Sequence, residues 1–294
     1  MVKYHSEADM SNQAKIREEA AKLNPIDDIM FRKMAEDREF CEEIIRVILG
    51  EPDLIVTENT VEWVGTNLQG RSVRLDTKCT MSDGRIVNVE VQRADNDDHQ
   101  KRVRYNGAIL TTNTTDPGDK FENVPNVIVI YLSQFDIFEK GKTLYHVDRV
   151  LRETKDVLDN GYNEIYVNTK VDDGTDVSEL MKLFVHSDAY NDKFPKMSER
   201  KRLFKEGEEG RITMSETLLK MMNDSKTEGI REGIQEGIRE GKKEGKKEGI
   251  REGVKMLGSL IQKLISENRS SEIEAVVNDE AYRNQLYAEF GIIP

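Results

Sequence analysis

Residues 71–92 constrain the fold of this chain most strongly, because they have the pattern of a single β-hairpin. Two runs rich in β-branched residues, RSVRLDTKCT and RIVNVEVQ, flank Asp83-Gly84, a dipeptide typical of tight turns between antiparallel strands. In the second run, three valines alternate with Asn88, Glu90 and Gln92. One side of that strand can therefore pack in a core while the other side lines a cleft.

The register of this hairpin decides which side chains face one another across the strands. A three-residue loop over residues 82–84, with Gly84 in the left-handed conformation, sets Asp76 opposite Glu90. A two-residue loop instead sets Asp76 opposite Val91 and turns Glu90 to the other side of the sheet. We expect the first arrangement. The second remains the alternative, and it would separate the two acids.

Two carboxylates at facing positions have Cβ atoms roughly 5 Å apart and repel each other unless a cation neutralises them. Asp76 and Glu90, with the amide of Gln92 on the same face, favour Mg²⁺ or Mn²⁺ over zinc, since no thiolate or histidine pair accompanies them. Such an ion lowers the pKa of a bound water and polarises a phosphodiester, as nuclease chemistry requires. The alternative is that both acids simply face solvent, as acids on antiparallel hairpins commonly do.

The sequence before the hairpin predicts helices. Residues 1–23 form a polar segment with helical composition, and Asn24-Pro25 interrupts it. Asp27 and Asp28 then lie at the head of an apolar pattern that predicts two helices and ends at Gly50-Glu51-Pro52. We expect a domain to start at residue 24.

The sequence after the hairpin alternates helical and strand patterns, which indicates an α/β domain. Residues 97–113 have helical spacing, and the run NVIVIYL after Pro125 has the composition of a buried strand. Further apolar or helical stretches lie at residues 143–151, 162–169 and 177–186. We expect this domain to span residues 24–205.

Beyond residue 205 the composition changes to a repeat. Within residues 206–258, Glu-Gly pairs recur every four residues, with glycines at 229, 233, 237, 241, 245, 249 and 253. Glycine costs a helix roughly 1 kcal/mol per position relative to alanine, and Glu–Arg or Glu–Lys pairs three residues apart return only a few tenths. A partner helix following this period would cross with right-handed sense. A helix that pairs into a homo-oligomer and a flexible spacer are therefore equally favoured, and residues 259–294 predict two short amphipathic helices.

Composition limits the function classes. The formal net charge is -12, which argues against a broad basic surface and restricts any DNA contact to a local patch. Cys41 and Cys79 form no metal-type cluster and indicate buried thiols in a reducing compartment. No apolar run approaches membrane-spanning length and the first residues lack a signal-like apolar region, so we expect a cytoplasmic protein without membrane contact.

Three ordered motifs resemble the recombination-promoting nuclease and transposase-like branch of the PD-(D/E)XK superfamily: NPIDDIMFRKM, RLDTKCTMSDGRIVNVEVQ and HQKRVRYNGAIL. The resemblance covers about residues 24–205. It implies an α/β, restriction-endonuclease-like core with a mixed central sheet flanked by helices, here followed by a C-terminal α-helical extension. It also implies DNA as the substrate and a divalent metal, Mg²⁺ or Mn²⁺, as the cofactor.

The motif match implies that Asp76, Glu90 and Gln92 are the catalytic residues, with Asp76 and Glu90 as metal ligands. The superfamily commonly has a lysine where this sequence has Gln92, a neutral amide that orients water or phosphate but carries no charge. The electrostatic contribution of the lysine must then come from elsewhere. The nearest cations in the sequence are Arg93, Lys101, Arg102 and Arg104.

The resemblance further implies that Arg102 and Tyr105 line the site, and that Asp28 is a possible accessory acid; we add Arg93 to the substrate-binding residues. His99, a lone histidine in a polar segment, is expected to be exposed and without a role. The neighbouring acids indicate loop chemistry or helix capping rather than a metal site: Asp95, Asp97 and Asp98.

Two functions remain after these observations. The first is a divalent-metal-dependent DNA endonuclease, which accounts for the most residues. The second is a catalytically weak or inactive nuclease-fold protein that acts as a DNA-binding or oligomeric scaffold, which the acidic net charge favours.

Overall fold

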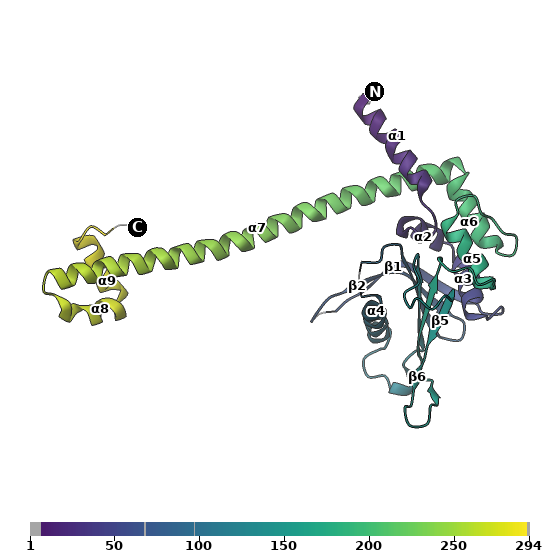
Figure 1. The fold of residues 1–294 in the computed structure, drawn as a ribbon, viewed down its shortest axis with the longest axis horizontal. Helices are drawn as coiled ribbons and strands as arrows, with labels where there is room; N and C mark the ends of the chain where they lie inside the picture. Colours follow the sequence, from purple (N-terminus) through teal and green to yellow (C-terminus); the bar gives the residue numbers. More distant parts are fainter. Residues whose placement is uncertain (1–6, 68, 97, 293–294) are drawn as a thin grey trace. The chain divides into compact units, whose positions relative to one another are not determined.

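A six-stranded mixed sheet forms the centre of the first part of the chain (Figure 1). The strand order is β1-β2-β3-β4-β8-β5; β1, β2 and β3 pair antiparallel, β3, β4 and β8 pair parallel, and β5 is antiparallel to β8. The expected mixed sheet is confirmed. The strands are β1 Val56–Gly65, β2 Val73–Met81, β3 Ile86–Gln92, β4 Val127–Ser133, β5 Leu144–Val147 and β8 Tyr162–Asn168.

This computed structural model describes residues 7–67, 69–96 and 98–292, and Asp97 lies outside them. The chain divides into two compact units, residues 1–221 and residues 222–294. A polar helix, α1 Glu7–Lys22, precedes the Asn24-Pro25 break. A short hairpin and a 3-10 turn complete the first unit: β6 Arg149–Val150, β7 Val157–Leu158 and Phe121–Asn123.

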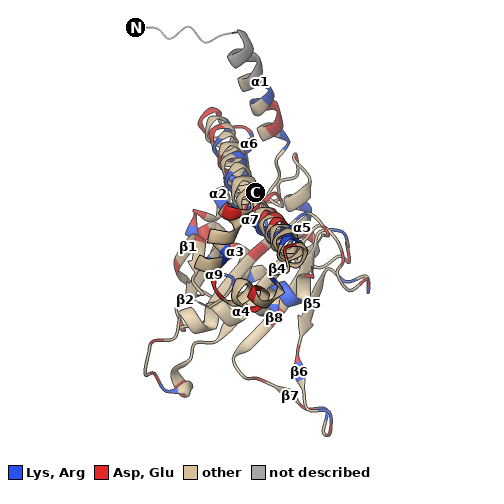
Figure 2. Ribbon diagram, turned by 90° about the vertical axis from the view of Figure 1, so that its left-hand side faces the viewer, with Lys and Arg blue, Asp and Glu red and all other residues tan. Residues whose placement is uncertain are grey.

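Helices cover both faces of the sheet, because its central strands are apolar on both sides. Every residue of β4 is buried and none is charged, and Figure 2 shows charged residues mainly on helices and loops. Helix α4 covers one face. That helix, α4, spans His99–Asn113. The helices that pack on the other face are α2 Asp28–Ala35, α3 Arg38–Leu49, α5 Asp176–Val185 and α6 Pro195–Lys205.

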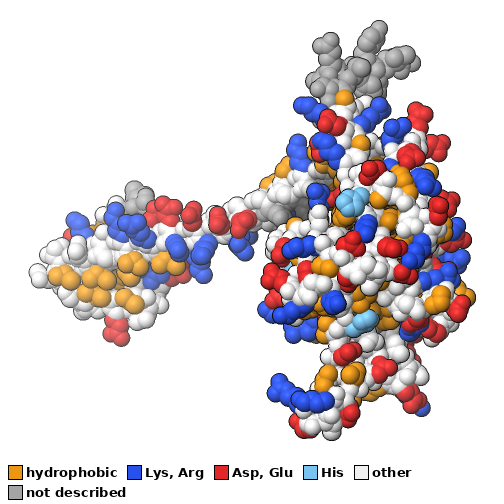
Figure 3. All heavy atoms as spheres, turned by 45° about the vertical axis from the view of Figure 1, so that its right-hand side comes forward, with side chains coloured by type: hydrophobic (Ala, Val, Ile, Leu, Met, Phe, Trp, Pro, Cys, Tyr) orange, Lys and Arg blue, Asp and Glu red, His pale blue; other side chains and the backbone are white. Residues whose placement is uncertain are grey.

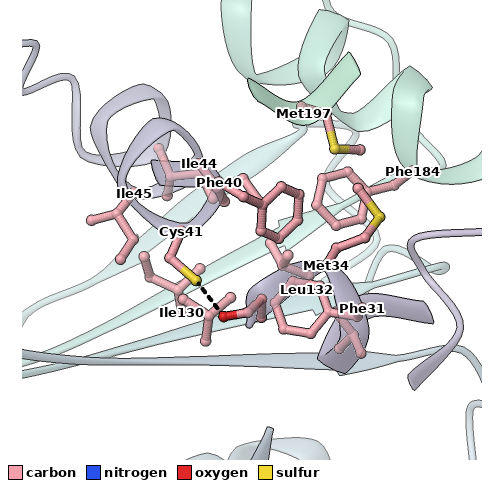
Figure 4. Packing of buried hydrophobic residues seen from close by; sticks show 14 of the residues in the cluster. Phe31, Met34, Phe40, Cys41, Ile44, Ile45, Ile130, Leu132, Phe184 and Met197 are labelled. Carbon is pink, nitrogen blue, oxygen red and sulfur yellow. Dashed lines mark hydrogen bonds between the residues drawn. The ribbon is translucent and has the colours of Figure 1, made fainter. Parts of the chain in front are cut away.

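The larger core lies between the sheet and α2, α3, α5 and α6 (Figure 4). Phe31 packs between Phe40 and Phe184, with ring centroids 6.1 and 6.4 Å away. The Cys41 thiol donates to Ala35 O in this core, and Cys79 is buried as well. Both cysteines are free and buried, as the sequence predicted. This packing fixes α2, and hence Asp28, against the sheet.

The Gly-Glu repeat lies within a single long helix, α7 Glu208–Ser266, which continues from the first unit into the second. Within the second unit, Leu260 and Leu264 of α7 pack against Val276 and Leu286. Val276 lies in α8 Ile273–Asn278 and Leu286 lies in α9 Glu280–Glu289, the two terminal helices that the sequence predicted. Both helices follow a 3-10 turn at Ser270–Glu272. None of the described helices, α7 included, has the length and apolar character needed to cross a membrane.

Candidate active site

The turn between β2 and β3 sets the register of the site. The Met81 N–H donates to Arg85 O at 2.8 Å, and Gly84, with φ of +87°, lies in the left-handed region. The strands pair Thr77 with Val89. The three-residue loop is confirmed and the two-residue alternative is wrong, because left-handed Gly84 closes the longer loop.

Past Thr77, side-chain hydrogen bonds take over from the backbone pairing of β2 and β3. Asp76 and Glu90 are the next residue of each strand beyond the last backbone pair, Thr77 with Val89. The Asp76 N–H donates to Glu90 Oε1 at 3.2 Å, and the Val91 N–H donates to Asp76 Oδ2 at 2.9 Å. Each carboxylate thus satisfies a backbone N–H of the facing strand, and the two acids are held next to each other where regular pairing ends.

Glu90 is only 1% exposed. Asn88 Nδ2 donates to its Oε1 at 3.0 Å, whereas its buried Oε2 has no hydrogen-bond partner and lies 3.8 Å from Arg102 Nη2. Burial raises the pKa of Glu90 to about 7, against the opposing effects of Asn88 and Arg102. A buried carboxylate oxygen without a hydrogen bond is costly when ionised, so a cation at this oxygen would be strongly favoured.

Helix α2 brings a third acid to this pair. Asp28, the first residue of α2, pairs with Arg32 one turn later, and its buried Oδ1 has no hydrogen-bond partner. Burial raises the pKa of Asp76 well above its usual range, and the charges of Glu90 and Asp28 raise it further. The three carboxyl groups therefore influence one another electrostatically.

Gln92 and Arg102 meet at the end of β3. Arg102 Nη1 donates to Gln92 Oε1 at 3.2 Å, and Gln92 Nε2 donates to Ala94 O at 2.7 Å. Since Arg102 also lies near Glu90, one guanidinium on α4 contacts both members of the Glu-x-Gln element. Its side chain is 38% exposed, so it remains open to a ligand.

The other two expected substrate-binding residues lie apart from the carboxylates. Arg93 pairs with Asp27 through Nη1 and Oδ1 at 2.6 Å, and its side chain is 65% exposed. The Tyr105 hydroxyl donates to Arg71 O and accepts from Asn67 Nδ2, one turn along α4 from Arg102. Neither side chain has a hydrogen bond with Asp76, Glu90 or Gln92 in the described part of the chain.

Sequence reasoning missed two partners of the acids. Arg32 contacts Asp28 and, at 2.5 Å, Glu62 on β1, whose φ of +52° is unusual for a strand residue. Arg32 lies four residues after Asp28 on a helix that the sequence predicted, and this spacing could have indicated the ion pair. The alternation along β3 put Asn88 on the same face as Glu90 but gave it no role, and it donates a hydrogen bond to Glu90.

The expectation for His99 was wrong, since this residue is 7% exposed. As the first residue of α4, it bonds Tyr131 through Nδ1 and Asp95 through Nε2, both at 2.9 Å, and its ring lies 4.8 Å from that of Phe135. Tyr131 comes from buried β4, a contact that no local pattern reveals. Asp98 caps α4 by accepting from the Lys101 N–H, as expected for this acidic segment.

The donor set of the site suits a hard divalent cation. Asp28, Asp76 and Glu90 offer only oxygen ligands, and two of their buried oxygens lack hydrogen bonds. Among the described residues, no three His, Cys, Asp or Glu side chains already converge on one metal position. The residues therefore fit a hard divalent cation such as Mg²⁺ or Mn²⁺ in the chemistry of their ligand atoms.

A family model described as PD-(D/E)XK nuclease family transposase matches residues 40–236, more than half of the chain. The matched range contains β1 to β8 and every expected site residue except Asp28. No curated protein and no solved structure matches the chain.

Proposed function

Because this chain belongs to the PD-(D/E)XK nuclease family transposases, we propose that it is a divalent-metal-dependent endonuclease that hydrolyses phosphodiester bonds of DNA. The observation that carries the proposal is a pair of adjacent carboxylates, Glu90 buried and Asp76 half-buried. Asp76 and Glu90 each bond a backbone N–H of the facing strand, yet Glu90 Oε2 is left without a hydrogen bond. A structural role alone gives no reason to keep a buried and a half-buried acid side by side.

In this proposal Asp76 and Glu90 are the ligands of Mg²⁺ or Mn²⁺, and Asp28 is an accessory acid. The bound ion would supply a water of lowered pKa and polarise the scissile phosphate. The tight hydrogen bonds of Asp76 and Glu90 to the backbone hold both carboxylates in fixed orientations.

Gln92 and Arg102 act together beside the carboxylates. The amide of Gln92 orients the attacking water or the phosphate, and Arg102 holds that amide through Oε1. Arg102 also supplies the positive charge that a lysine gives in other superfamily members, since its guanidinium lies next to Glu90. Arg93 and Tyr105 contact substrate further from the reacting phosphate.

The test compares wild type with Asp76→Asn and Glu90→Gln on plasmid DNA in Mg²⁺ or Mn²⁺. We expect wild type to nick or linearise the plasmid and each variant to lose on the order of a thousandfold in rate, because metal assistance is worth several kcal/mol. Glu122→Gln, at a side chain that is 70% exposed, is the matched control. Equal cleavage by all four proteins would refute the proposal.

The second candidate is a nuclease-fold scaffold with little or no catalysis. It is favoured by one observation, that no three acidic, histidine or cysteine side chains of the described residues converge on a metal position. Calorimetric titration with Mn²⁺ separates the two candidates. Binding by wild type that is lost in Asp76→Asn supports the enzyme, and no binding supports the scaffold.

We also propose that α7 makes the protein a homo-oligomer. The repeat carries exposed isoleucines at Ile230, Ile234 and Ile238, which are 55 to 58% exposed and follow the glycines. Ridges of residues four apart pack well into the same ridges of another helix. Light scattering of the full chain and of a chain ending at Met221 tests this, since only the full chain should exceed the monomer mass.

A further inference from the structure

A groove of about 530 Å³ lies between the first half of α4 and the start of β2. One wall is formed by Asp98, Lys101, Arg102 and Tyr105, whose spacing of three or four residues puts them on one face of α4. The other wall is the segment from Arg71 to Arg74. Arg102 lines this groove and also donates to Gln92, so one side chain joins the groove to the candidate active site.

The groove is basic in an acidic protein. Its single acid, Asp98, is occupied as the cap of α4 and pairs with Lys101 at 2.7 Å. Over the face drawn in Figure 3, by contrast, acidic and basic side chains are interspersed. The cations that line the groove are Arg71, Arg74, Lys101, Arg102 and Arg104.

Tyr105 gives the groove a fixed aromatic wall. Its hydroxyl donates to Arg71 O and accepts from Asn67 Nδ2, so the ring is tied to the opposite wall at its tip. The ring is half-buried against the core beneath α4 and lines the groove, so its exposed part can contact a flat ligand at little cost in side-chain entropy. Cations along a groove together with such a ring are the combination that binds single-stranded nucleic acid.

We propose that this groove binds a single-stranded stretch of DNA leading away from the scissile phosphate, with a base stacked on Tyr105 and the backbone on Arg71, Arg74 and Arg104. The inference rests on the proposed function, because it takes Arg102 as the junction between the two sites. A volume of about 530 Å³ is in the range of clefts that hold a small ligand, which matches a short stretch of one strand. The enzyme therefore prefers DNA with an unpaired segment beside the cut.

The experiment measures fluorescence anisotropy of a labelled oligodeoxynucleotide in EDTA, so that binding is independent of metal and of cleavage. We expect single-stranded DNA to bind at least tenfold more tightly than the same sequence as a duplex. The Arg71→Glu, Arg104→Glu double variant should lose most of this affinity. The matched control is the double variant Lys120→Glu with Arg152→Glu, which reverses the charge of two exposed cations outside the groove. This control should bind single-stranded DNA like wild type.

Tyr105 separates stacking from charge. Tyr105→Ala should weaken single-strand binding about fivefold to hundredfold, the usual effect of removing a stacked aromatic ring, while Tyr105→Phe, which keeps the ring, should stay close to wild type. Circular dichroism of each variant excludes misfolding. Equal affinity for single strand and duplex, or full affinity in the charge-reversed double variant, would overturn the inference.

Failure of the two proposals gives different results. If Asp76→Asn binds the single strand normally while wild type cleaves no DNA, the groove stands and the nuclease proposal fails. If wild type cleaves plasmid in Mg²⁺ but the groove variants bind single strand unchanged, the nuclease stands and the groove assignment fails.

Discussion

Glycine occurs inside two helices of this chain for opposite reasons. In α4, a Cβ added at Gly107 would lie 2.2 Å from the ring of Tyr162 on β8, so close helix–sheet packing requires glycine there. In α7, a Cβ added at Gly229, Gly237 or Gly253 would meet nothing within 4 Å. The local cost of glycine is offset by tertiary packing in α4, whereas among the described residues no such packing offsets it at the repeat glycines of α7.

Acidic residues show the same contrast. Glu90 is buried in the sheet, and its pKa is raised to about 7 by that burial. Glu236 of the repeat has a side chain that is 64% exposed and pairs with Arg239 at 3.2 Å. In the first unit, tertiary contacts determine how buried an acidic residue is and what its pKa is. In the repeat, the environment of an acidic residue comes from its neighbours along the same helix. The following predictions test this comparison.

Gly107→Ala should have the largest effect. The new methyl group overlaps the Tyr162 ring, and overpacking of this severity lowers the free energy of unfolding by about 3 kcal/mol. Urea denaturation followed by tryptophan fluorescence measures it through Trp63, which packs against the same core as Tyr162. A change below about 0.5 kcal/mol would mean that α4 and β8 are not in close contact.

Glu90→Gln should change the pH dependence of stability in the absence of metal. Because burial raises the pKa of Glu90 from 4.5 to about 7, the folded state holds a proton that the unfolded state has released. The free energy of unfolding of wild type therefore falls as the pH rises from about 4.5 to about 7. In Glu90→Gln this loss disappears, so the variant should be more stable than wild type by roughly 2 to 3 kcal/mol at pH 8.

Thermal unfolding at pH 5 and pH 8 with EDTA measures this effect. Glu236→Gln is the matched control at an exposed glutamate, and its stability should follow wild type at both pH values. Identical pH dependence of Glu90→Gln and wild type would show that Glu90 is not buried as described.

Gly237→Ala should stabilise the helix by about 1 kcal/mol, because alanine replaces glycine in open space. Circular dichroism at 222 nm should show a higher melting temperature for the helical signal. If the second copy that we propose packs closely enough to contact the glycines as well as the isoleucines of the repeat, light scattering should at the same time show a lower mass. An unchanged mass would contradict pairing through the glycine face.

Arg239→Gln should have the smallest effect. It removes one exposed pair with Glu236, worth a few tenths of a kcal/mol. The melting temperature of the helical signal should change very little, and only at low salt. A loss above about 1 kcal/mol would mean that Arg239 makes a contact beyond its own helix.

The local parts of the site could be predicted from sequence. Turn chemistry at Gly84 fixed the register of β2 and β3, and alternation along β3 assigned Glu90 and Gln92 to one face. Both signals act over a few residues, so no knowledge of the remaining fold was needed.

The partners of these residues could not be predicted from local patterns, and only the family resemblance put Arg102 and Asp28 near the site. Asp28 beside Asp76 and His99 with Tyr131 join elements far apart in sequence, and the bond of Arg102 to Gln92 depends on how α4 packs on the sheet. A polar segment before a helix looks exposed in sequence, yet the side chain of His99 is covered because β4 and Phe135 lie beneath the start of α4.

The sequence by itself determined the hairpin, its two facing acids, the family and the unusual repeat, because each depends on residue type and short spacing. Only the tertiary structure decided which helix covers which face of the sheet, and so brought α2 and α4 to opposite sides of β2 and β3. Burial, the raised pKa values of the acids and the basic groove follow from that packing, which depends on the apolar surface of the whole unit.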